Sequence, residues 1–264
     1  MTRRYQALVC DLDGVVYRGK AAVPYAVDQL NAFPGRIMYA TNNASRPPAV
    51  VADQLRALGL DCQDSDVVTS SQAGAWLLTQ RLGHGAPVLA VGGPGVAIAL
   101  TESGLKPIVP TDAEGAEIEA VLQGYGPAVS ASDLAEAAYA VAAGALWVAT
   151  NLDTTLPTER GLAPGGGSLI QAVCLAVGRA PDLVAGKPRS PIYELALARL
   201  GLNADQALAV GDRLDTDIEG AVAAGMDSLF VQTGVDSEAA ARSAPAHQAP
   251  TYVAADLRFL ESLG

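Results

Sequence analysis

Short apolar segments alternate with amphipathic segments along most of the chain. The apolar segments have the length of buried strands, and they lie at Ala7–Cys10, Ile37–Ala40, Val88–Val91, Ala120–Leu122, Leu146–Ala149, Leu183–Ala185, Ala207–Val210 and Ser228–Val231, with a last short strand expected at Tyr252–Val253. The amphipathic segments predict helices, and they lie at Pro48–Leu58, Leu134–Ala142, Leu169–Val177, Pro191–Leu200 and Ile218–Ala224, with a surface helix expected near Glu238–Ala246. Strands that alternate with helices are typical of parallel sheets covered on both faces. The pattern therefore predicts an α/β fold.

Length and composition leave room for a large core. The chain has 264 residues, of which 50% are hydrophobic, so it can form one large α/β domain or a core with an inserted domain. Its 28 acidic and 17 basic residues give a formal net charge of −11. Nucleic acids bind through clustered Lys and Arg, and the sequence has no basic cluster, so we expect no nucleic-acid partner. A negative protein repels anions, so a phosphate substrate would require cations placed locally at its site.

Neither a membrane span nor a secretory leader is expected from the sequence. No apolar run approaches the ~18 residues that a membrane-spanning helix needs, and the apolar stretch behind the basic start, Met1–Gln6, is too short for a signal peptide. The cysteines, Cys10, Cys62 and Cys174, are odd in number and scattered. This usage is typical of a reduced protein without structural disulfides or zinc. We therefore expect a cytoplasmic protein, with Cys10 inside a core strand.

Polar side chains follow four of the apolar segments. After the first segment come Asp11 and Asp13, one residue apart, and then Gly14. Two carboxylates at this spacing repel each other unless a cation lies between them, and a hard ion with oxygen ligands such as Mg²⁺ would relieve the repulsion. A solvated turn is the alternative, because the same residue types are common in turns.

The other three strand ends carry complementary chemistry. Thr41, Asn42 and Asn43 offer a hydroxyl and two carboxamides, which can bind phosphate oxygens or form a helix-capping turn. Lys187 can offset the charge of a phosphate or lie at the surface. The segment Asp212–Asp217 has three carboxylates in six residues, which require solvent or a cation. Because the carboxyl ends of parallel strands meet at one edge of a sheet, all four segments can form one site.

Taken in order, Asp11, Asp13, Thr41, Lys187 and the Asp212–Asp217 segment resemble the four motifs of the haloacid dehalogenase superfamily of phosphotransferases. Within it, the chain is similar to the branch of 4-nitrophenylphosphatase-like and NagD-like phosphatases. The middle of the chain resembles the large inserted cap of that branch, the C2 type, at Thr150–Asp153, Leu156–Thr158 and Gly165–Ser168. The resemblance therefore covers nearly the whole chain.

The resemblance implies a Rossmann-like parallel-sheet core with an inserted α/β cap. The interval between Asn43 and Lys187 is too long for a single crossover and contains its own strand and helix patterns. We expect the core at residues 1–77 and 182–264 and the cap at residues 78–181. Caps in this branch often mediate dimers, which implies a possible homodimer through the cap.

The resemblance also implies the catalytic residues. Asp11 would attack phosphorus and form an aspartyl-phosphate, and Asp13 would protonate the leaving oxygen and then activate the hydrolytic water. Mg²⁺ would be held by Asp11, the backbone carbonyl of Asp13, and Asp212. Asp217 would orient metal-bound waters or Lys187, and Lys187 would offset charge on Asp11 and on the phosphate.

Other residues are expected to bind the substrate. Thr41, Asn42 and Asn43 would bind the phosphoryl group. Arg160 is the only cation in the segment Asp153–Gly161, our candidate for the loop that selects the leaving group. Arg213 and Asp215 have no assigned role, and we expect them to face solvent or to pair with each other. The two histidines, His84 and His247, follow no strand, so we expect both at the surface and no Ser-His-Asp triad.

The expected function is hydrolysis of a small phosphorylated metabolite by a Mg²⁺-dependent phosphatase. The candidate loop lacks aromatic residues for stacking on a base, and the chain resembles glycerol-phosphate phosphatases, so glycerol 3-phosphate is the favoured substrate. Nucleoside monophosphates, phosphoglycolate and other sugar phosphates remain alternatives. Two other classes also remain, a non-catalytic regulator that binds a phosphometabolite and a phosphomutase. The acids Asp11 and Asp13 favour the phosphatase, because a pure binder needs no general acid.

Overall fold

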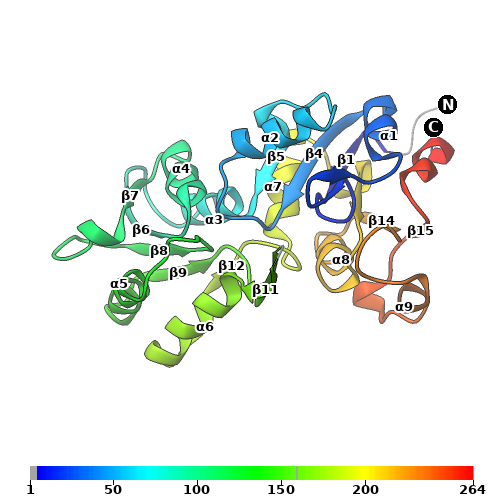
Figure 1. Cartoon of the computed structure of the whole chain (residues 1–264). Coiled ribbons are helices and arrows are strands. Elements are labelled where there is room, and N and C mark those ends of the chain that lie inside the picture. Colours follow the sequence, from blue (N-terminus) through cyan, green and yellow to red (C-terminus); the bar gives the residue numbers. More distant parts are fainter. Residues whose placement is uncertain (1–4, 159, 264) are drawn as a thin grey trace. The chain divides into compact units, whose positions relative to one another are not determined.

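A computed structural model describes residues 5–158 and 160–263. Within them the chain forms two compact units (Figure 1). Of the described residues, 5–41, 48–68 and 187–263 form the first unit, and 42–47, 69–158 and 160–186 form the second. Each unit is built around a parallel sheet, which confirms the α/β fold predicted from the alternation of strands and helices.

The first unit contains a six-stranded sheet in the order β15-β14-β13-β1-β4-β5. Its strands are β1 (Ala7–Cys10), β4 (Arg36–Thr41), β5 (Val67–Thr69), β13 (Ala207–Gly211), β14 (Asp227–Val231) and β15 (Tyr252–Ala254). The central strand β1 is parallel to both of its neighbours, and Cys10 lies opposite Val210 on one side and Tyr39 on the other. This register places the carboxyl ends of β1, β4 and β13 almost level.

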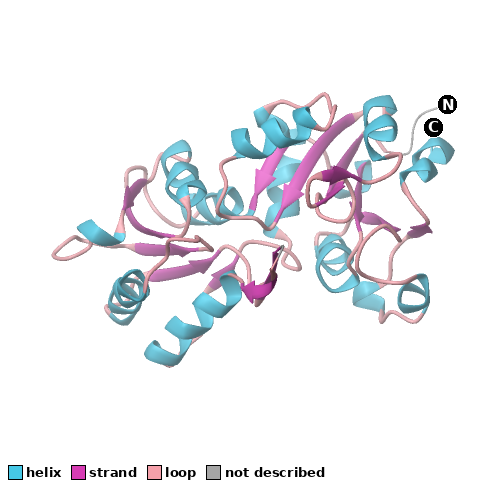
Figure 2. Ribbon diagram, viewed as in Figure 1, coloured by secondary structure: helices cyan, strands magenta, loops and turns pink. Residues whose placement is uncertain are grey.

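Helices cover both faces of this sheet (Figure 2). On one face lie α1 (Ala26–Ala32) and α2 (Pro48–Ala57), whose apolar residues join Leu8 and Cys10 in one core cluster. On the other lie α7 (Pro191–Leu200), in contact with β1 and β4, and α8 (Glu219–Ala223), in contact with β14. Because β1 is covered on both sides, all four of its residues are buried, Cys10 among them as predicted.

Shorter elements complete the first unit. They are the hairpin β2 (Tyr17–Arg18) and β3 (Ala21–Ala22), the helix α9 (Glu238–Arg242), a π-helical turn at Leu214–Ile218, and 3-10 turns at Asp64–Asp66, Ala204–Gln206, Ala246–Gln248 and Leu257–Leu263. The π-helical turn directly precedes α8, so the helix predicted at Ile218–Ala224 is continuous with a wider turn at its start.

The second unit contains a five-stranded parallel sheet in the order β12-β9-β8-β6-β7. Its elements are β6 (Pro87–Val91), β7 (Lys106–Ile108), β8 (Ala120–Gln123), β9 (Leu146–Ala149), β12 (Leu183–Val184), α3 (Ser70–Thr79), α4 (Pro94–Glu102), α5 (Ala131–Ala142), α6 (Gly166–Val177) and a 3-10 turn at Pro110–Asp112. Helices α5 and α6 pack on one face around Trp147, while α3 and α4 contact the strands from the other. A separate antiparallel hairpin is formed by β10 (Thr155–Thr158) and β11 (Gly161–Pro164).

All of the predicted strands and helices are present, but the sequence analysis missed several elements. The expected loop at Asp153–Gly161 is partly wrong, because Thr155–Thr158 pairs with Gly161–Pro164 in the hairpin. Most of the hairpin is exposed, so its sequence lacks the apolar alternation that would have indicated strands. Helix α3 was also missed, although Thr69 and Gln72 form a capping box that marks its start.

The second unit takes in residues 42–47 and then continues from Thr69, just before α3, whereas the cap was expected to begin at residue 78. Helix α3 belongs to the second unit because it packs against β8 and α4. The packing is close, since a Cβ atom on Gly74 of this helix would lie 2.5 Å from a methyl carbon of Leu122. The assignment of the second unit as a cap stays a prediction. Among the described residues, no helix is both long enough and apolar enough to cross a bilayer.

Candidate active site

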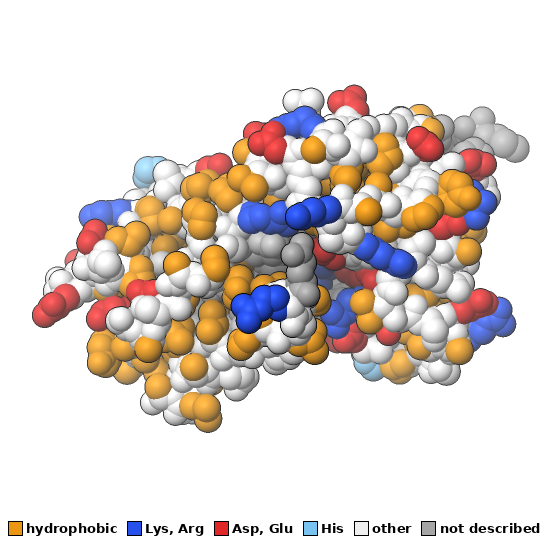
Figure 3. All heavy atoms as spheres, in the orientation of Figure 1, with side chains coloured by type: hydrophobic (Ala, Val, Ile, Leu, Met, Phe, Trp, Pro, Cys, Tyr) orange, Lys and Arg blue, Asp and Glu red, His pale blue; other side chains and the backbone are white. Residues whose placement is uncertain are grey.

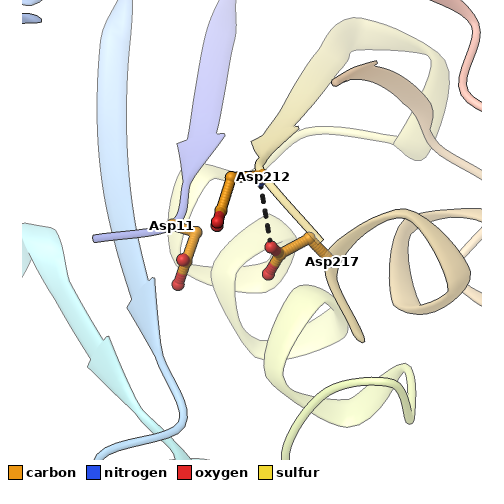
Figure 4. Close-up of side chains that lie close together, drawn as sticks. All are labelled: Asp11, Asp212 and Asp217. Atoms are coloured by element: carbon orange, nitrogen blue, oxygen red, sulfur yellow. Dashed lines mark hydrogen bonds between the residues drawn. The ribbon is translucent and has the colours of Figure 1, made fainter. Parts of the chain in front are cut away.

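Three carboxylates meet at the carboxyl edge of the first sheet. Asp11 follows β1 and Asp212 follows β13, and the Asp11 amide donates a hydrogen bond of 2.9 Å to the Val210 carbonyl across these neighbouring strands. Asp217 lies in the π-helical turn that comes next along the chain. One oxygen atom of each carboxylate lies within 4.8 Å of the others (Figure 4). The sheet register therefore brings together acids that are 201 positions apart in sequence, as the numbers 11 and 212 show.

Lys187 supplies a cation to this cluster. Its Nζ donates to Asp11 Oδ1 in a short contact, to Asp217 Oδ1 at 2.7 Å and to the Ala40 carbonyl at 3.3 Å. The side chain of Lys187 is 4% exposed. Three ionised carboxylates and one ammonium leave the cluster with a net charge of −2. A buried excess of this size favours a divalent cation.

The same excess of negative charge contributes to the shifted pKa values of Asp11, Asp212 and Lys187. Burial raises the pKa of Asp11 well above its usual range, and the charge of Asp217 adds to the effect while Lys187 opposes it. Burial and the charge of Asp217 likewise raise the pKa of Asp212 to about 6. Burial lowers the pKa of Lys187, but the attraction of Asp11 and Asp217 outweighs it and the net shift is upward. Lys187 therefore stays protonated.

The hydrogen bonds of Asp212 and Asp217 differ. Asp217 is fully engaged, because its Oδ1 accepts from Lys187 and its Oδ2 accepts from the backbone amides of Asp212 and Arg213 at 3.2 and 3.1 Å. Asp212 Oδ2 accepts from the Val235 amide at 2.8 Å. Asp212 Oδ1 is buried without a hydrogen-bond partner among the described residues. A buried carboxylate oxygen without a donor, beside two further carboxylates, fits a hard cation such as Mg²⁺.

Asp13 lies apart from the three clustered carboxylates. It is exposed, and its backbone forms a bridge with Tyr17 at the start of the β2–β3 hairpin. The sequence suggested a cation between Asp11 and Asp13. In the structure the carboxylates close to Asp11 are those of Asp212 and Asp217. Asp11 contacts buried Lys187, whereas Asp13 is exposed to solvent.

Thr41 belongs to the first unit, whereas Asn42 and Asn43 belong to the second. Thr41 ends β4 and is buried. The carbonyl of Asn42 accepts hydrogen bonds from Asn151 Nδ2 at 2.7 Å and from Ser70 Oγ at 2.8 Å, both within the second unit. The Asn42 side chain donates to Asp153 Oδ2 at 3.1 Å. Hydrogen bonds to both its backbone and its side chain therefore fix Asn42.

Asn43 has a structural function in this segment. Its Oδ1 accepts hydrogen bonds from the amides of Ser45 and Arg46 at 3.0 and 3.2 Å, which closes a turn just before α2. The capping turn that the sequence left open as an alternative is therefore present at Asn43. Its proposed contact with phosphate stays a prediction.

The remaining predicted residues lie at exposed positions. Arg160 is exposed in the turn of the β10–β11 hairpin, where its amide donates to Thr158 Oγ1 at 3.2 Å. Arg213 and Asp215 pair with each other at 3.1 Å, and both are exposed, as expected. The histidines, His84 and His247, are also exposed, as predicted.

Three glycines make room for the carboxylates. A Cβ atom on Gly14 or on Gly234 would overlap Asp212 Oδ2, and one on Gly211 would overlap the Cβ of Asp217. Gly14 follows the Asp11 and Asp13 pair noted in the sequence and Gly211 directly precedes the Asp212–Asp217 segment, but Gly234 was missed. The signal was available, because Thr233 and Gly234 form one more polar segment soon after a predicted strand, β14.

Family models and a known enzyme match the sequence of this chain. Residues 8–106 match the family model described as haloacid dehalogenase-like hydrolase, and residues 184–260 match one described as HAD-hydrolase-like. Over 260 residues the chain is 46% identical to the D-glycerol 3-phosphate phosphatase of Mycobacterium tuberculosis, a match that covers 98% of this chain and 72% of that protein.

Solved structures give the same result. A crystal structure of glycerol phosphate phosphatase from Mycobacterium tuberculosis in complex with magnesium matches with a TM-score of 0.92 and 46% identity, over 98% of this chain and 78% of that chain. The p-nitrophenyl phosphatase from Archaeoglobus fulgidus matches with a TM-score of 0.87 and 28% identity, over 98% and 99% of the two chains. The likeness thus extends over both units, and each of these relatives is named as a phosphatase.

Proposed function

We propose a mechanism and a substrate class from the premise that this chain belongs to the haloacid dehalogenase-like hydrolases. It is a phosphatase, an enzyme that hydrolyses phosphate monoesters. The family resemblance read from the sequence is therefore confirmed. The observation that carries the mechanism is the cluster of Asp11, Asp212 and Asp217 around the ammonium group of Lys187.

Asp11 is the nucleophile in this mechanism. Burial and Asp217 raise the pKa of the Asp11 carboxyl group, and Lys187 opposes this rise and so favours the ionised form that attacks phosphorus. An Asp11 oxygen bonds to phosphorus as the bond from phosphorus to the leaving oxygen breaks. Asp13 donates a proton to the leaving oxygen. A water molecule then attacks the aspartyl-phosphate while Asp13 takes a proton from it, which releases phosphate and restores Asp11. The exposure of Asp13 supports this exchange, because a general acid that also acts as a base must reach both leaving group and water.

The metal site uses the remaining oxygen atoms. Asp11, Asp212 and the backbone carbonyl of Asp13 would hold Mg²⁺, which when bound neutralises charge on the phosphate. The unpartnered Oδ1 of Asp212 supports this assignment. Asp217 is engaged by Lys187 and by two backbone amides, which supports a role in positioning Lys187 and the Asp212 backbone.

The substrate is a small phosphorylated metabolite, and glycerol 3-phosphate is the first candidate. The support is the 46% identity to an enzyme named D-glycerol 3-phosphate phosphatase. Thr41, Asn42 and Asn43 bind the phosphoryl group in this proposal, and Arg160 contacts the leaving group. Nucleoside monophosphates, phosphoglycolate and sugar phosphates are the competing substrates.

Phosphate release from a panel of monoesters tests this proposal. The purified protein should hydrolyse glycerol 3-phosphate with a higher kcat/KM than any nucleoside monophosphate, phosphoglycolate or sugar phosphate in the panel. Activity should disappear in excess EDTA and return with added Mg²⁺. Binding of glycerol 3-phosphate without turnover would favour the regulator, and transfer of the phosphoryl group to a sugar would favour the phosphomutase. A nucleotide with the highest kcat/KM would contradict the assignment of the substrate.

We also propose a homodimer formed through the second unit. Hydrophobic side chains gather over α5 and α6 in Figure 3. Tyr139 of α5 is 67% exposed and Leu175 of α6 is 85% exposed. Exposed aromatic and aliphatic side chains of this size are typical of protein interfaces. Light scattering should give twice the mass of the chain for the native protein and the single mass for a Tyr139→Glu, Leu175→Glu variant. A monomeric native protein would contradict the proposal.

We infer a cytoplasmic location from the cysteines. Cys10 and Cys62 are buried thiols and Cys174 is half-buried, a state that a reducing compartment maintains. Cell fractionation should recover the enzyme with cytoplasmic markers, and recovery from the medium would contradict the inference.

A further inference from the structure

The loop that follows β14 packs against Asp212. We call residues Thr233–Asp236 the β14 loop. Its Val235 amide donates to Asp212 Oδ2 at 2.8 Å, and its Asp236 amide donates to the Asp212 carbonyl at 3.4 Å. These bonds hold the backbone and one carboxylate oxygen of Asp212, so its other oxygen, Oδ1, is the one left without a protein partner among the described residues.

Gly234 permits this close approach. A Cβ atom there would overlap Asp212 Oδ2 and crowd the carbon atoms of its side chain. The φ angle of Gly234 lies outside the left-handed region, so its backbone conformation is open to other residues. The glycine is therefore required by its distance from Asp212 rather than by its conformation.

The β14 loop also holds both neighbouring segments of the site. The carboxylate of Asp236 accepts a hydrogen bond of 2.8 Å from the amide of Leu214, the first residue of the turn that carries Asp217. On the other side, Thr233 Oγ1 donates to the carbonyl of Gly14 at 2.7 Å, directly after Asp13. One short loop thus contacts the segments that follow β1 and β13.

We propose that the β14 loop is a positioning element for the metal site. The Val235 amide donates a hydrogen bond to Asp212 Oδ2, and Gly234 permits the close approach that this bond requires. The loop thereby fixes the carboxylate so that Oδ1 is available to the cation. Asp236 holds the start of the turn that carries Asp217. This inference rests on the proposed function, because it assumes that Asp212 binds Mg²⁺.

A matched pair of glycine substitutions tests the proposal. Gly234→Ala adds a methyl group against Asp212, whereas Gly83→Ala adds one where no described heavy atom lies within 4 Å, and neither glycine has a left-handed φ. The free proteins are titrated with MgCl₂, and the half-saturating concentration is read from the rise in melting temperature. We expect Gly234→Ala to bind Mg²⁺ about 10–100-fold more weakly than the native protein, the range typical for loss of a group that orients a metal ligand. Gly83→Ala should bind as the native protein does.

A second pair covers the case in which Gly234→Ala does not fold, as judged by circular dichroism. Asp236→Ala removes the acceptor for the Leu214 amide, whereas Asp236→Asn retains a side-chain oxygen in its place. Mg²⁺ affinity should fall in Asp236→Ala and recover in Asp236→Asn.

The outcomes separate this inference from the function on which it rests. If the native protein shows no Mg²⁺-dependent rise in melting temperature, the proposed metal site is wrong. If the native protein binds Mg²⁺ and Gly234→Ala, once folded, binds it equally well, the β14 loop has no positioning role. If Gly234→Ala does not fold and Asp236→Ala binds Mg²⁺ as tightly as Asp236→Asn does, the β14 loop likewise has no positioning role.

Discussion

Replacing Lys187 by Met should destabilise the protein through charge rather than through packing. Methionine retains most of the aliphatic stem, but it removes the ammonium group that donates to Asp11 and Asp217. Lys187 is 4% exposed, and the two carboxylates are 12% and 3% exposed, so water cannot replace the lost cation. The variant therefore leaves buried carboxylates without their protein counter-ion.

The expected loss follows from the burial of the pair. Removing one partner of a buried ion pair costs about 3–5 kcal/mol in the free energy of unfolding, because the other charge stays buried without compensation. Here two carboxylates lose the same partner, so we expect the upper part of that range at neutral pH. Protonation of the carboxylates offers an escape, and it makes the loss depend on pH.

The pKa of Asp11 determines the sign of this pH dependence. Burial and Asp217 already raise the pKa of Asp11, and Lys187 is the group that opposes this shift, so its removal raises the pKa further. A carboxyl group whose pKa is higher in the folded than in the unfolded state binds more protons when folded. Stability is then lost as the pH rises from the unfolded pKa, near ~4, through the folded value. The deficit of Lys187→Met should therefore be smaller at about pH 5 than at about pH 8.

Urea denaturation at these two pH values, without divalent ions, measures the effect. Lys106→Met is the control, because Lys106 is exposed in β7 and its replacement should change the free energy of unfolding by less than about 0.5 kcal/mol. Added Mg²⁺ should restore part of the stability of Lys187→Met by supplying positive charge to the same carboxylates. An equal deficit at both pH values, with no response to Mg²⁺, would show that Lys187 acts through packing and would refute this reasoning.

Three further predictions concern the metal and the substrate. Asp217→Asn should raise the Mg²⁺ concentration for half-maximal activity about 10–100-fold, and Asp212→Asn should raise it further. If a Mg²⁺ titration gives the same half-maximal concentration for both variants, the two residues do not have different roles. Burial and Asp217 raise the pKa of Asp212 to about 6, so protons should compete with Mg²⁺ and the Mg²⁺ concentration for half-maximal activity should increase as the pH falls below that value. A constant half-maximal concentration between about pH 5 and pH 8 would count against Asp212 as a ligand. Arg160→Ala should lower kcat/KM for glycerol 3-phosphate more than for 4-nitrophenyl phosphate, whose good leaving group needs little help; one common factor for both substrates would remove Arg160 from substrate selection.

The sequence was sufficient to predict the central part of the site. Asp11 and Asp212 each follow a short apolar segment, and parallel pairing of β1 with β13 brings the carboxyl ends of these strands to one edge. Lys187 follows β12, which belongs to the other sheet, so this pairing does not account for its approach. The alternation of strands and helices therefore predicted the fold class, and the order of polar segments after strands predicted the meeting of Asp11 with Asp212. Their approach depends on backbone pairing, which a local hydrophobic pattern predicts well.

Side-chain directions and irregular segments were harder to predict. Asp13 departs from Asp11 because β1 ends at Cys10, so the alternation of a strand no longer fixes which way the next side chains point. The turn at Asn43 depends on two backbone amides that come close only after folding. The polar segment after β14 indicated a place at the same sheet edge, but the need for glycine at position 234 comes from its closeness to Asp212, which no local pattern predicts.

Trapping the phosphorylated enzyme tests the central claim most directly. The Asp13→Asn variant, incubated with Mg²⁺ and 4-nitrophenyl phosphate labelled in the phosphoryl group and quenched in acid, should retain label on the peptide that contains Asp11. The good leaving group of this substrate departs without the proton that Asp13 would give, so the first step still proceeds. Asp13→Asn keeps the nucleophile but lacks the base that activates water for hydrolysis, so the intermediate should accumulate. The Asp11→Asn variant should retain no label and show no turnover. Label on another residue, or steady-state hydrolysis by pure Asp11→Asn protein, would contradict the assignment of Asp11 as the nucleophile.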